Sequence, residues 1–479
     1  MKKSIKWNTL IYSIKILTST LFPLITFPYI SRVLLPEEVG RYNFSSAVVS
    51  YFSVFAALGI TTYAIKEGAK VRDNKNEIAV LSQELYSINI ASTLATLFVF
   101  VLSIVVIPKF RDYVVLLLIL SSGIPLTTIG TEWIFNVFED YDYITLRSVI
   151  FQILSLILMF VFVKSPDDVE VYALITVVSS AGNNIFNYRR ANRYFKHKFV
   201  ITKRMKNHII PIVILFASAL ASQIYVNLDT TLIGFLSSDY SVGIYSAAAK
   251  IYNVLRNVLM AAITVLTPRM AQCFLRDEGN IAYMKLLNNS AVDYIALVIP
   301  AGFGVLCIAK DAIYVISGEE YLQATSSLMI LSIALIFSLL GSFIANEVLI
   351  ISNQENKILC ATIIGAMLNF CGNLVAIPRA GIIGAAITTV ISEMVVFFLQ
   401  LYYAREYLLN KGVFDAILKT LISCLPILLV ANLLKLCISN LTLRAFLTMI
   451  FGVVVYAISM KLLKHPAAFD LENMIGRNK

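Results

Sequence analysis

Long apolar runs separated by short polar breaks fill the chain from Leu10 to Leu463. Each run approaches or exceeds the roughly 20 residues that a helix needs to cross a hydrocarbon core about 30 Å thick. Only helices and closed barrels satisfy all their backbone hydrogen bonds in lipid, and these runs lack the alternation of barrel strands. The pattern therefore predicts an all-α polytopic membrane protein with about fourteen transmembrane helices.

The polar breaks give approximate bounds for these helices. They are 8–28, 42–65, 80–107, 113–134, 145–163, 171–188, 209–236, 243–267, 286–309, 321–351, 358–377, 382–403, 420–437 and 445–460. Tight turns are expected in the short gaps 108–112 and 378–381, where Pro108, Pro378 and Gly381 are suitable turn residues.

Composition agrees with this class, because 58% of the residues are hydrophobic and only 14% are charged. A soluble globular chain is nearer half apolar and a quarter charged. The net charge of +10 would suggest nucleic acid in a soluble protein, but here the basic residues gather in particular loops. The six cysteines form no CxxC pair and are interpreted as small buried hydrophobic residues.

The distribution of Lys and Arg predicts the orientation of the chain. With the N-terminus placed inside, the inner segments hold 27 basic residues and the outer segments hold 8. Both termini are therefore expected in the cytoplasm. The segment 189–208 is expected on the same side, and it carries eight basic residues and no acidic one.

A weak internal repeat accompanies this basic segment. Val39-Gly40-Arg41-Tyr42 and Val242-Gly243-Ile244-Tyr245 lie 203 residues, or six predicted helices, apart. Two six-helix lobes around a central cavity are a common transporter plan. The expected division is an N-lobe at 1–208, joined through 189–208 to a C-lobe at 209–404, with two trailing helices and a tail at 405–479.

Basic residues within membrane spans are the first candidates for a binding site, since charges there are costly and usually face a polar interior. Lys250, Asn253, Arg256 and Asn257 fall within an arc of about 120° on one helix, with the two cations about 9 Å apart along its axis. They form a cationic wall for an anionic substrate, or else they snorkel or pair with an acid such as Asp229. Lys15 and Arg32 join the cationic hypothesis, although Arg32 is equally suited to the membrane interface.

Polar stripes and embedded acids are a second set of candidates. Asp229 ends a stripe on the seventh helix with Ser218, Ser222 and Tyr225, and such stripes line water-filled cavities or form helix-packing seams. Acids in spans often couple transport to protons or cations, and Asp229 is the strongest candidate for that role. The other embedded acids are Glu132, Asp293, Glu347 and Glu393.

Catalytic motifs are nearly absent from the sequence. Asp140-Tyr141-Asp142 has the DxD spacing of many glycosyltransferases, but no soluble domain surrounds it, and no Walker A sequence occurs. The chain is therefore predicted not to be an enzyme and to need no cofactor.

Several stretches resemble a known family of transporters. They include Phe27-Pro28-Tyr29-Ile30-Ser31-Arg32-Val33-Leu34, Glu132-Trp133-Ile134-Phe135, Val242-Gly243-Ile244-Tyr245-Ser246-Ala247-Ala248-Ala249-Lys250 and Gly381-Ile382-Ile383-Gly384-Ala385-Ala386. The resemblance covers nearly the whole chain. These stretches resemble the Wzx-type repeat-unit flippases of bacterial polysaccharide synthesis. Those flippases belong to the multidrug/oligosaccharidyl-lipid/polysaccharide exporter superfamily.

This resemblance implies a function and a location. Such proteins move an undecaprenyl-diphosphate-linked oligosaccharide across the bacterial cytoplasmic membrane for O-antigen or capsule, by alternating access. The resemblance implies that the cations Lys15, Arg32, Lys250 and Arg256 bind the anionic diphosphate of the substrate. Asn253 and Asn257 would be their polar neighbours. A polysaccharide polymerase and glycosyltransferases are the partners that the resemblance implies.

The resemblance to lipid II flippases also suggests an ion site. Some of them hold sodium with an acid on the seventh helix, an amide–acid pair on the eleventh and a threonine on the twelfth. Here Asp229, Asn369, Asn373 and Thr389 match those positions, but Asn373 stands where an acid is expected. Coupling to Na⁺ or H⁺ is thus one hypothesis, and simple pairing of the two amides is the other.

Two rival functions remain at this stage. A drug exporter of the same superfamily would favour acidic walls for its cationic substrates. A membrane polymerase or glycosyltransferase would usually need a large external loop or a cytoplasmic domain, and the sequence predicts neither.

Overall fold

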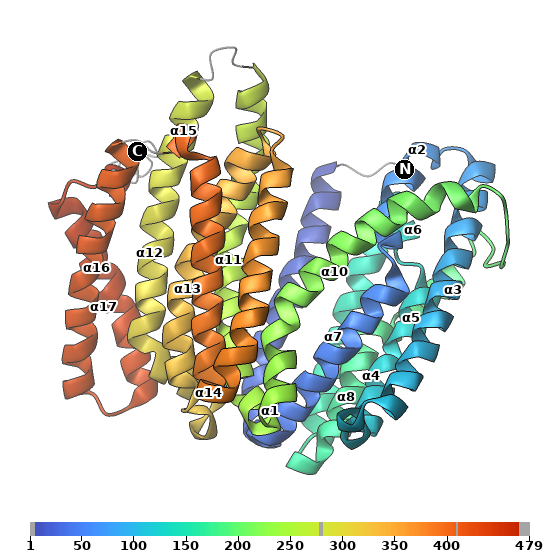
Figure 1. The fold of residues 1–479 in the computed structure, drawn as a ribbon, viewed down its shortest axis with the longest axis horizontal. Coiled ribbons are helices and arrows are strands. Elements are labelled where there is room, and N and C mark those ends of the chain that lie inside the picture. The colour runs from blue at the N-terminus through green and yellow to red at the C-terminus, as the bar shows by residue number, and fades with distance from the viewer. Residues whose placement is uncertain (1–4, 277–280, 409–410, 469–479) are drawn as a thin grey trace. The chain divides into compact units, whose positions relative to one another are not determined.

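The computed structural model describes residues 5–276, 281–408 and 411–468 (Figure 1). Regular structure in these ranges is helical throughout, and eleven of the segments are long and apolar enough to cross a membrane. The prediction of an all-α polytopic membrane protein is confirmed. The first basic residues and the end of the predicted cytoplasmic tail lie outside the described ranges.

The eleven segments agree with fourteen predicted helices once their backbone breaks are considered. Phe22–Val71 and Glu355–Tyr403 each cover parts of two predicted helices, which meet at Leu35 (φ 62°, ψ 169°) and at Gly381 (φ 55°, ψ −134°). Val169–Ala191, which includes a π-helical turn, corresponds to the predicted sixth helix. Gly381 supplies the turn expected at 378–381, because glycine adopts positive φ without a Cβ penalty.

Contacts group the chain into two compact units, Met1–Gly243 and Ile244–Lys479. The elements of the first are α1 (Ile5–Ala57), α2 (Ile60–Val71), α3 (Lys75–Val106), η1 (Pro108–Tyr113), α4 (Val114–Ser121), α5 (Gly123–Gly130), α6 (Trp133–Val137), α7 (Tyr141–Phe162), η2 (Pro166–Asp168), α8 (Val169–Val177), η3 (Val178–Gly182), α9 (Asn184–Ala191) and α10 (Met205–Leu236). In this unit α1 packs against α3, α7 and α10. The lobe boundary predicted at 208 is not tested by this grouping and stays a prediction.

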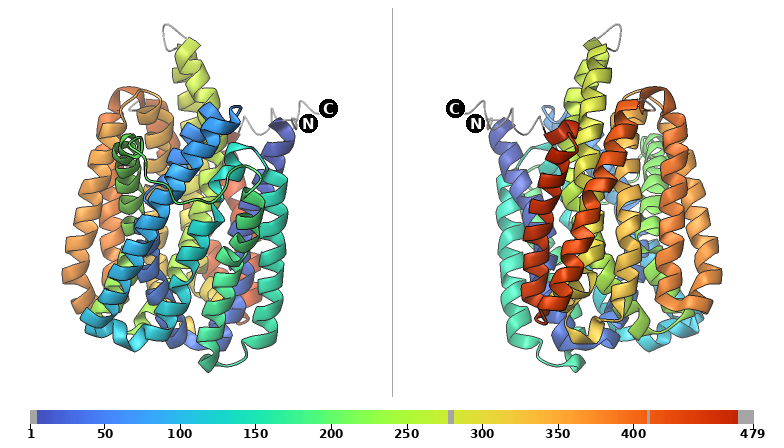
Figure 2. Two further views of the ribbon diagram at one scale, coloured as in Figure 1. Left: turned by 90° about the vertical axis from the view of Figure 1, so that its right-hand side faces the viewer. Right: turned by 90° about the vertical axis from the view of Figure 1, so that its left-hand side faces the viewer.

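The second unit begins within α11 (Asp239–Arg276). Its other elements are α12 (Ile281–Ser317), η4 (Glu319–Tyr321), α13 (Ala324–Ile344), η5 (Ala345–Ile350), α14 (Glu355–Tyr403), α15 (Arg405–Leu408), α16 (Lys411–Cys437) and α17 (Leu441–Leu462). The helix α12 packs against α13, α16 and α17, and the last two lie side by side at the red end of the ribbon (Figure 2). Ile295, Cys424 and Ile427 form a buried apolar cluster between α12 and α16.

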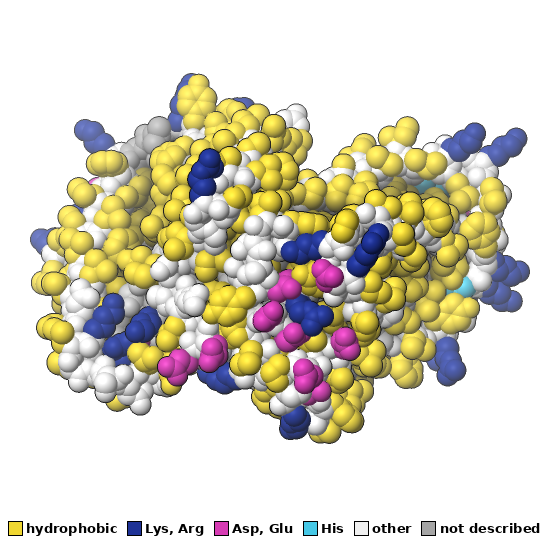
Figure 3. All heavy atoms as spheres, turned by 60° about the horizontal axis from the view of Figure 1, so that its bottom comes forward, with side chains coloured by type: hydrophobic (Ala, Val, Ile, Leu, Met, Phe, Trp, Pro, Cys, Tyr) yellow, Lys and Arg dark blue, Asp and Glu magenta, His cyan; other side chains and the backbone are white. Residues whose placement is uncertain are grey.

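Large apolar side chains remain on the outside of these helices. Phe98 on α3 is 72% exposed and Val453 on α17 is 69% exposed. Hydrophobic side chains also cover much of the face drawn in Figure 3. Exposed apolar surface of this extent is unusual for a soluble monomer and fits contact with lipid tails.

The repeated Val-Gly motifs meet in the first unit. A Cβ added to Gly40 would lie 1.8 Å from the backbone oxygen of Asp239, and one added to Gly243 would lie 1.8 Å from that of Pro36. The two glycines thus allow the second half of α1 to approach the start of α11 closely and reciprocally. The internal repeat of the sequence corresponds to this backbone contact.

One predicted helix is interrupted in the structure, and the prediction of its continuity was wrong. The helix predicted at 42–65 breaks where Leu58 and Gly59 adopt positive φ (46° and 71°), and a Cβ on Gly59 would lie 2.8 Å from the backbone nitrogen of Phe216 on α10. The helix predicted at 113–134 keeps helical backbone angles at Ser122, between α4 and α5, and ends at Thr131, whose φ is 41°. Close approach of neighbouring elements, which apolar patterns do not reveal, accounts for the break at Leu58 and Gly59.

Candidate functional site

The basic face predicted on the eighth helix lies on α11, which continues without a break from Asp239 to Arg276. Lys250, Asn253, Arg256 and Asn257 therefore keep the helical spacing on which the prediction depends. Lys250 and Arg256 are half-buried, and the two asparagines are exposed. The Nε of Arg256 donates to the Oγ of Ser338 on α13 at 2.9 Å, which orients the guanidinium.

Lys15 occupies a polar network in the first unit. Its Nζ lies 2.6 Å from Oε1 of Glu132, whose Oε2 lies 2.7 Å from Nη2 of Arg147 on α7. Arg147 also donates to Asn187 on α9, which in turn donates to Oδ1 of Asn184 at 3.0 Å. One carboxylate therefore joins α1, α7 and α9 from the N-terminal end of α6.

The surroundings of Glu132 favour the ionised form of its carboxyl group over the protonated form. Glu132 lies between the candidate spans Pro108–Gly130 and Tyr141–Phe162. Burial raises the pKa of its carboxyl, but the charges of Lys15 and Arg147 lower it by more, so the pKa lies below its usual value. The proposed substrate role of Lys15 is not tested by this pairing and stays a prediction.

Arg32 lies near the end of the first half of α1. Its Nη1 donates to the backbone oxygen of Pro28 at 2.5 Å, one helical turn earlier. The hydroxyl of Ser31 also donates to that carbonyl, at 3.4 Å, and the Arg32 side chain is exposed. Its predicted part in substrate binding also remains a prediction.

The amides predicted for an ion site are close together on α14. Nδ2 of Asn373 donates to Oδ1 of Asn369 at 3.1 Å, and Nδ2 of Asn369 lies 3.4 Å from Oγ1 of Thr389. Thr388, which the sequence analysis did not select, donates to Oδ1 of Asn373. The break at Gly381 folds α14 back on itself and so brings the threonines of its second half to the amides of its first.

Asp229, the acid of the predicted ion site, belongs to α10 in the first unit, whereas these amides belong to the second. Near Asp229, Nδ2 of Asn227 lies 3.4 Å from Oγ of Ser50, and the hydroxyls of Tyr51 and Thr231 are 3.0 Å apart. Polar side chains outside the predicted stripe therefore form part of the α1–α10 packing seam, and the role of the stripe itself stays a prediction.

Glu347 is an embedded acid that the sequence analysis noted without assigning a role. It is fully buried in the π-helical turn η5, where Oε1 accepts from Oγ1 of Thr267 at 2.5 Å. Its backbone oxygen accepts from the hydroxyl of Tyr283 at 2.7 Å. These bonds tie α11 and α12 to the end of α13.

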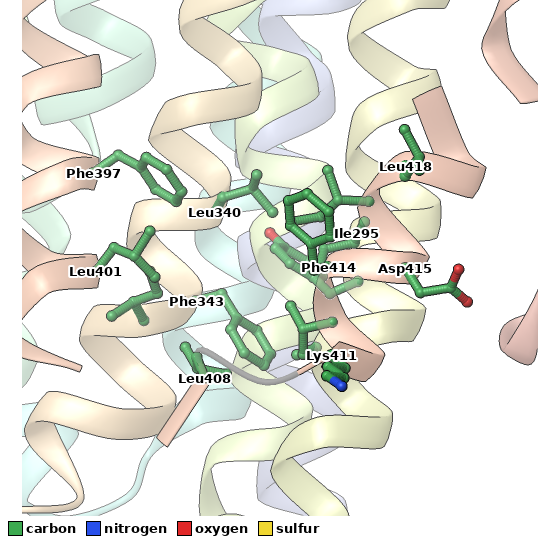
Figure 4. Close-up of a pocket in the computed structure, with 15 residues that line it drawn as sticks. Ile295, Leu340, Phe343, Phe397, Leu401, Leu408, Lys411, Phe414, Asp415 and Leu418 are labelled. Carbon is green, nitrogen blue, oxygen red and sulfur yellow. The ribbon is translucent and has the colours of Figure 1, made fainter. Parts of the chain in front are cut away.

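An apolar cavity of about 510 Å³ opens in the second unit (Figure 4). Phe343 on α13, Phe397 on α14 and Phe414 on α16 are among the side chains that line it, and Lys411 and Asp415 are its charged members. The preponderance of aromatic and aliphatic walls suits a hydrocarbon chain better than a sugar or a phosphate.

The residues of the DxD sequence have structural partners. Asp140 lies 2.7 Å from Nη2 of Arg190, and Asp142 accepts from Nε1 of Trp7 at 3.0 Å. Both carboxylates thus contribute to packing of the first unit.

These features define the class as a multi-pass helical membrane protein. The fold is similar to that of the solved structure titled "Lipid II flippase MurJ, inward closed conformation", with a TM-score of 0.76. The similarity covers 95% of this chain and 98% of that one at 15% sequence identity, and it shows the fold.

The chain belongs to the family described as "Polysaccharide biosynthesis protein", which it matches over residues 5–274. It is 25% identical over 416 residues to the "Putative O-antigen transporter" of Escherichia coli (strain K12), covering 85% of this chain and 98% of that relative. It is 24% identical over 391 residues to the "Capsular polysaccharide biosynthesis protein CapF" of Staphylococcus aureus, covering 79% and 93%. The resemblance to Wzx-type members of the exporter superfamily is confirmed.

Proposed function

We propose that this chain is a flippase, and not an enzyme, that moves undecaprenyl-diphosphate-linked oligosaccharide repeat units across the cytoplasmic membrane. The observation that carries the proposal is the similarity to a putative O-antigen transporter over 85% of the chain. Membership of a polysaccharide biosynthesis family and the flippase-like fold support it. The transported unit would be polymerised outside, so a polymerase and glycosyltransferases are the expected partners.

The cationic face of α11 gives the proposal a chemical basis. A diphosphate that leaves water needs compensating charge, and Arg and Lys form charge-assisted hydrogen bonds with phosphate oxygens. We assign that role to Lys250 and Arg256, with Asn253 and Asn257 beside them and with Lys15 and Arg32 as further cations. Alternating access of two lobes would expose this site to each side of the membrane in turn. In this scheme both termini are cytoplasmic.

Removal of the α11 cations is the direct test of this site. In a strain lacking the gene, we expect Lys250→Ala and Arg256→Ala to restore at least tenfold less surface polymer than wild type. A hydrogen bond to a charged group contributes about 1.5–3 kcal/mol, which corresponds to about ten- to hundredfold in binding. Lys435→Ala is a matched control, because Lys435 is an exposed span lysine on α16.

Polymer and lipid-linked intermediates are the quantities to measure, at matched expression of each variant. Accumulation of lipid-linked repeat units inside the deletion strain would support a flippase. Full polymer from both α11 variants would contradict the cationic site. Normal polymer in the deletion strain, in the absence of a redundant flippase, would favour a drug exporter of the same superfamily.

Ion coupling is the second part of the proposal. We assign a sodium or proton site to Asp229, with Asn369, Asn373 and Thr389 as its polar partners. The amide oxygen of Asn369 accepts from Asn373 and that of Asn373 accepts from Thr388, so both oxygens lie within one polar cluster. Carbonyl oxygens are ligands that hard cations prefer. The absence of an acid at position 373 removes one negative charge and would weaken the site.

Sodium should raise the melting temperature of the wild-type protein if this site binds the ion. Asp229→Asn should abolish the rise, whereas Asp415→Asn, at a half-buried ion pair with Lys419 on α16, should keep it. Melting curves in sodium chloride and in choline chloride at equal ionic strength give the comparison. Identical curves for the wild type in both salts would exclude a sodium site.

A further inference from the structure

A second cavity, of about 520 Å³, lies in the first unit beside α7 and α9. Four arginines line it, namely Arg147, Arg189, Arg190 and Arg193. Neither the family match nor the proposed substrate site accounts for this concentration of positive charge.

Among the described residues, carboxylates compensate two of these four charges. Arg147 pairs with Glu132 and Arg190 pairs with Asp140, each at 2.7 Å. Arg189 and Arg193 form no ion pair within the described part of the chain, and both are exposed. Arg189 lies on α9 and Arg193 lies in the turn that follows it, and both line the same cavity.

The paired arginines are held in place. The guanidinium of Arg190 lies 4.0 Å from the ring centroid of Tyr143, and Arg147 is anchored on α9 through Asn187. A rigid pair beside a free pair of guanidinium groups is suited to an anion with several oxygens, since each guanidinium can donate two parallel hydrogen bonds to phosphate.

The remaining wall of the cavity is apolar and faces outward. Leu146, Ile150 and Phe186 line it, and more than half of each side chain is exposed. Leu146 and Ile150 are one helical turn apart on α7, inside the candidate membrane span Tyr141–Phe162. The cavity therefore joins a basic end to a surface that meets lipid tails, and it is suited to an amphipathic anion.

We propose that this cavity binds an anionic glycerophospholipid of the surrounding membrane. The phosphate would lie at Arg189 and Arg193, and an acyl chain would follow Leu146, Ile150 and Phe186. Basic pockets beside transmembrane helices are known sites for anionic headgroups. The volume suits a phosphoglycerol group with the start of one acyl chain, and a diphosphate carrying several sugars would exceed it. This inference does not depend on the proposed transport function.

Native mass spectrometry of the full chain, released from nanodiscs with and without phosphatidylglycerol, tests the proposal. The wild type should retain phosphatidylglycerol in preference to phosphatidylcholine. Arg189→Gln/Arg193→Gln should bind it at least about tenfold more weakly. Lys203→Gln/Arg204→Gln removes the same charge from the same basic segment outside the cavity and should bind like wild type.

Several outcomes would overturn the proposal. If the two double variants retained phosphatidylglycerol equally, the cavity would not be its binding site. Displacement of the phospholipid from the wild type by glycerol phosphate at equal concentration would show that the apolar wall contributes nothing. Preferential displacement by a polyprenyl diphosphate would assign the cavity to the transported lipid. Melting of each variant in neutral detergent, expected to match wild type, shows that the protein is folded.

Discussion

Replacing Gly40 by alanine is expected to lower the free energy of unfolding by about 3 kcal/mol, the upper end of the usual range for overpacking. The new Cβ would lie 1.8 Å from the backbone oxygen of Asp239 and 2.9 Å from the backbone nitrogen of Gly243. No side-chain rotation relieves a clash with backbone, so α1 or α11 must move. The melting temperature of the purified variant, followed by size-exclusion chromatography in detergent, measures the effect.

Gly304→Ala is the matched control for this substitution. Gly304 lies within α12, and a Cβ there would meet nothing within 4 Å. Alanine favours a helix over glycine by about 0.5–1 kcal/mol, so this variant should melt at or slightly above the wild-type temperature. A Gly40→Ala protein that melts like Gly304→Ala would contradict the close contact of the two repeated motifs.

Glu132→Gln is expected to destabilise the first unit by about 3 kcal/mol, since it leaves the buried charge of Arg147 without its counter-ion. The Arg147 side chain is only 5% exposed, whereas that of Glu132 is 34% exposed. Because one partner is partly solvated, the expected loss of stability is at the low end of the range for a buried ion pair. Glu67→Gln removes a surface pair with Lys70 and should cost less than about 1 kcal/mol. Melting temperatures of the two variants give the comparison.

The stability that Glu132 contributes should decrease as the pH falls. Because Lys15 and Arg147 outweigh burial and hold the pKa of Glu132 below its usual value, the folded state favours the carboxylate. The stabilisation is therefore fully present above the usual glutamate pKa of about 4.3 and is lost as pH falls through the lower folded value. The gap between wild type and Glu132→Gln should narrow in that acid range, and a gap that widens there would contradict the network.

Features that depend on local pattern could be predicted from the sequence. Apolar runs predicted the helices because membrane spans must satisfy their backbone internally. Gly381 predicted the fold-back of α14, and helical spacing predicted the shared face of Lys250 and Arg256. Spacing by one helical turn also predicted that Asn369 and Asn373 are in contact, and Nδ2 of Asn373 lies 3.1 Å from Oδ1 of Asn369.

Features that depend on long-range contacts could not be predicted in this way. Lys15 was interpreted as a substrate cation, and its pairing with Glu132 joins residues 117 positions apart. Arg147 was not among the predicted site residues, although its side chain is buried in that network. The repeat around Gly40 and Gly243 was visible, but its meaning as a reciprocal backbone contact required the arrangement of α1 and α11.

Transport by the purified protein tests the central claim most directly. Vesicles would carry a fluorescent polyprenyl-diphosphate-linked oligosaccharide in both leaflets, and an impermeant reductant would quench the label outside. With the wild type and an imposed sodium or proton gradient, quenching should proceed beyond the outer-leaflet fraction, whereas protein-free vesicles and Arg256→Ala should stop near that fraction. Quenching that stops at the outer-leaflet fraction with folded wild-type protein, under either gradient, would contradict the assignment as a flippase.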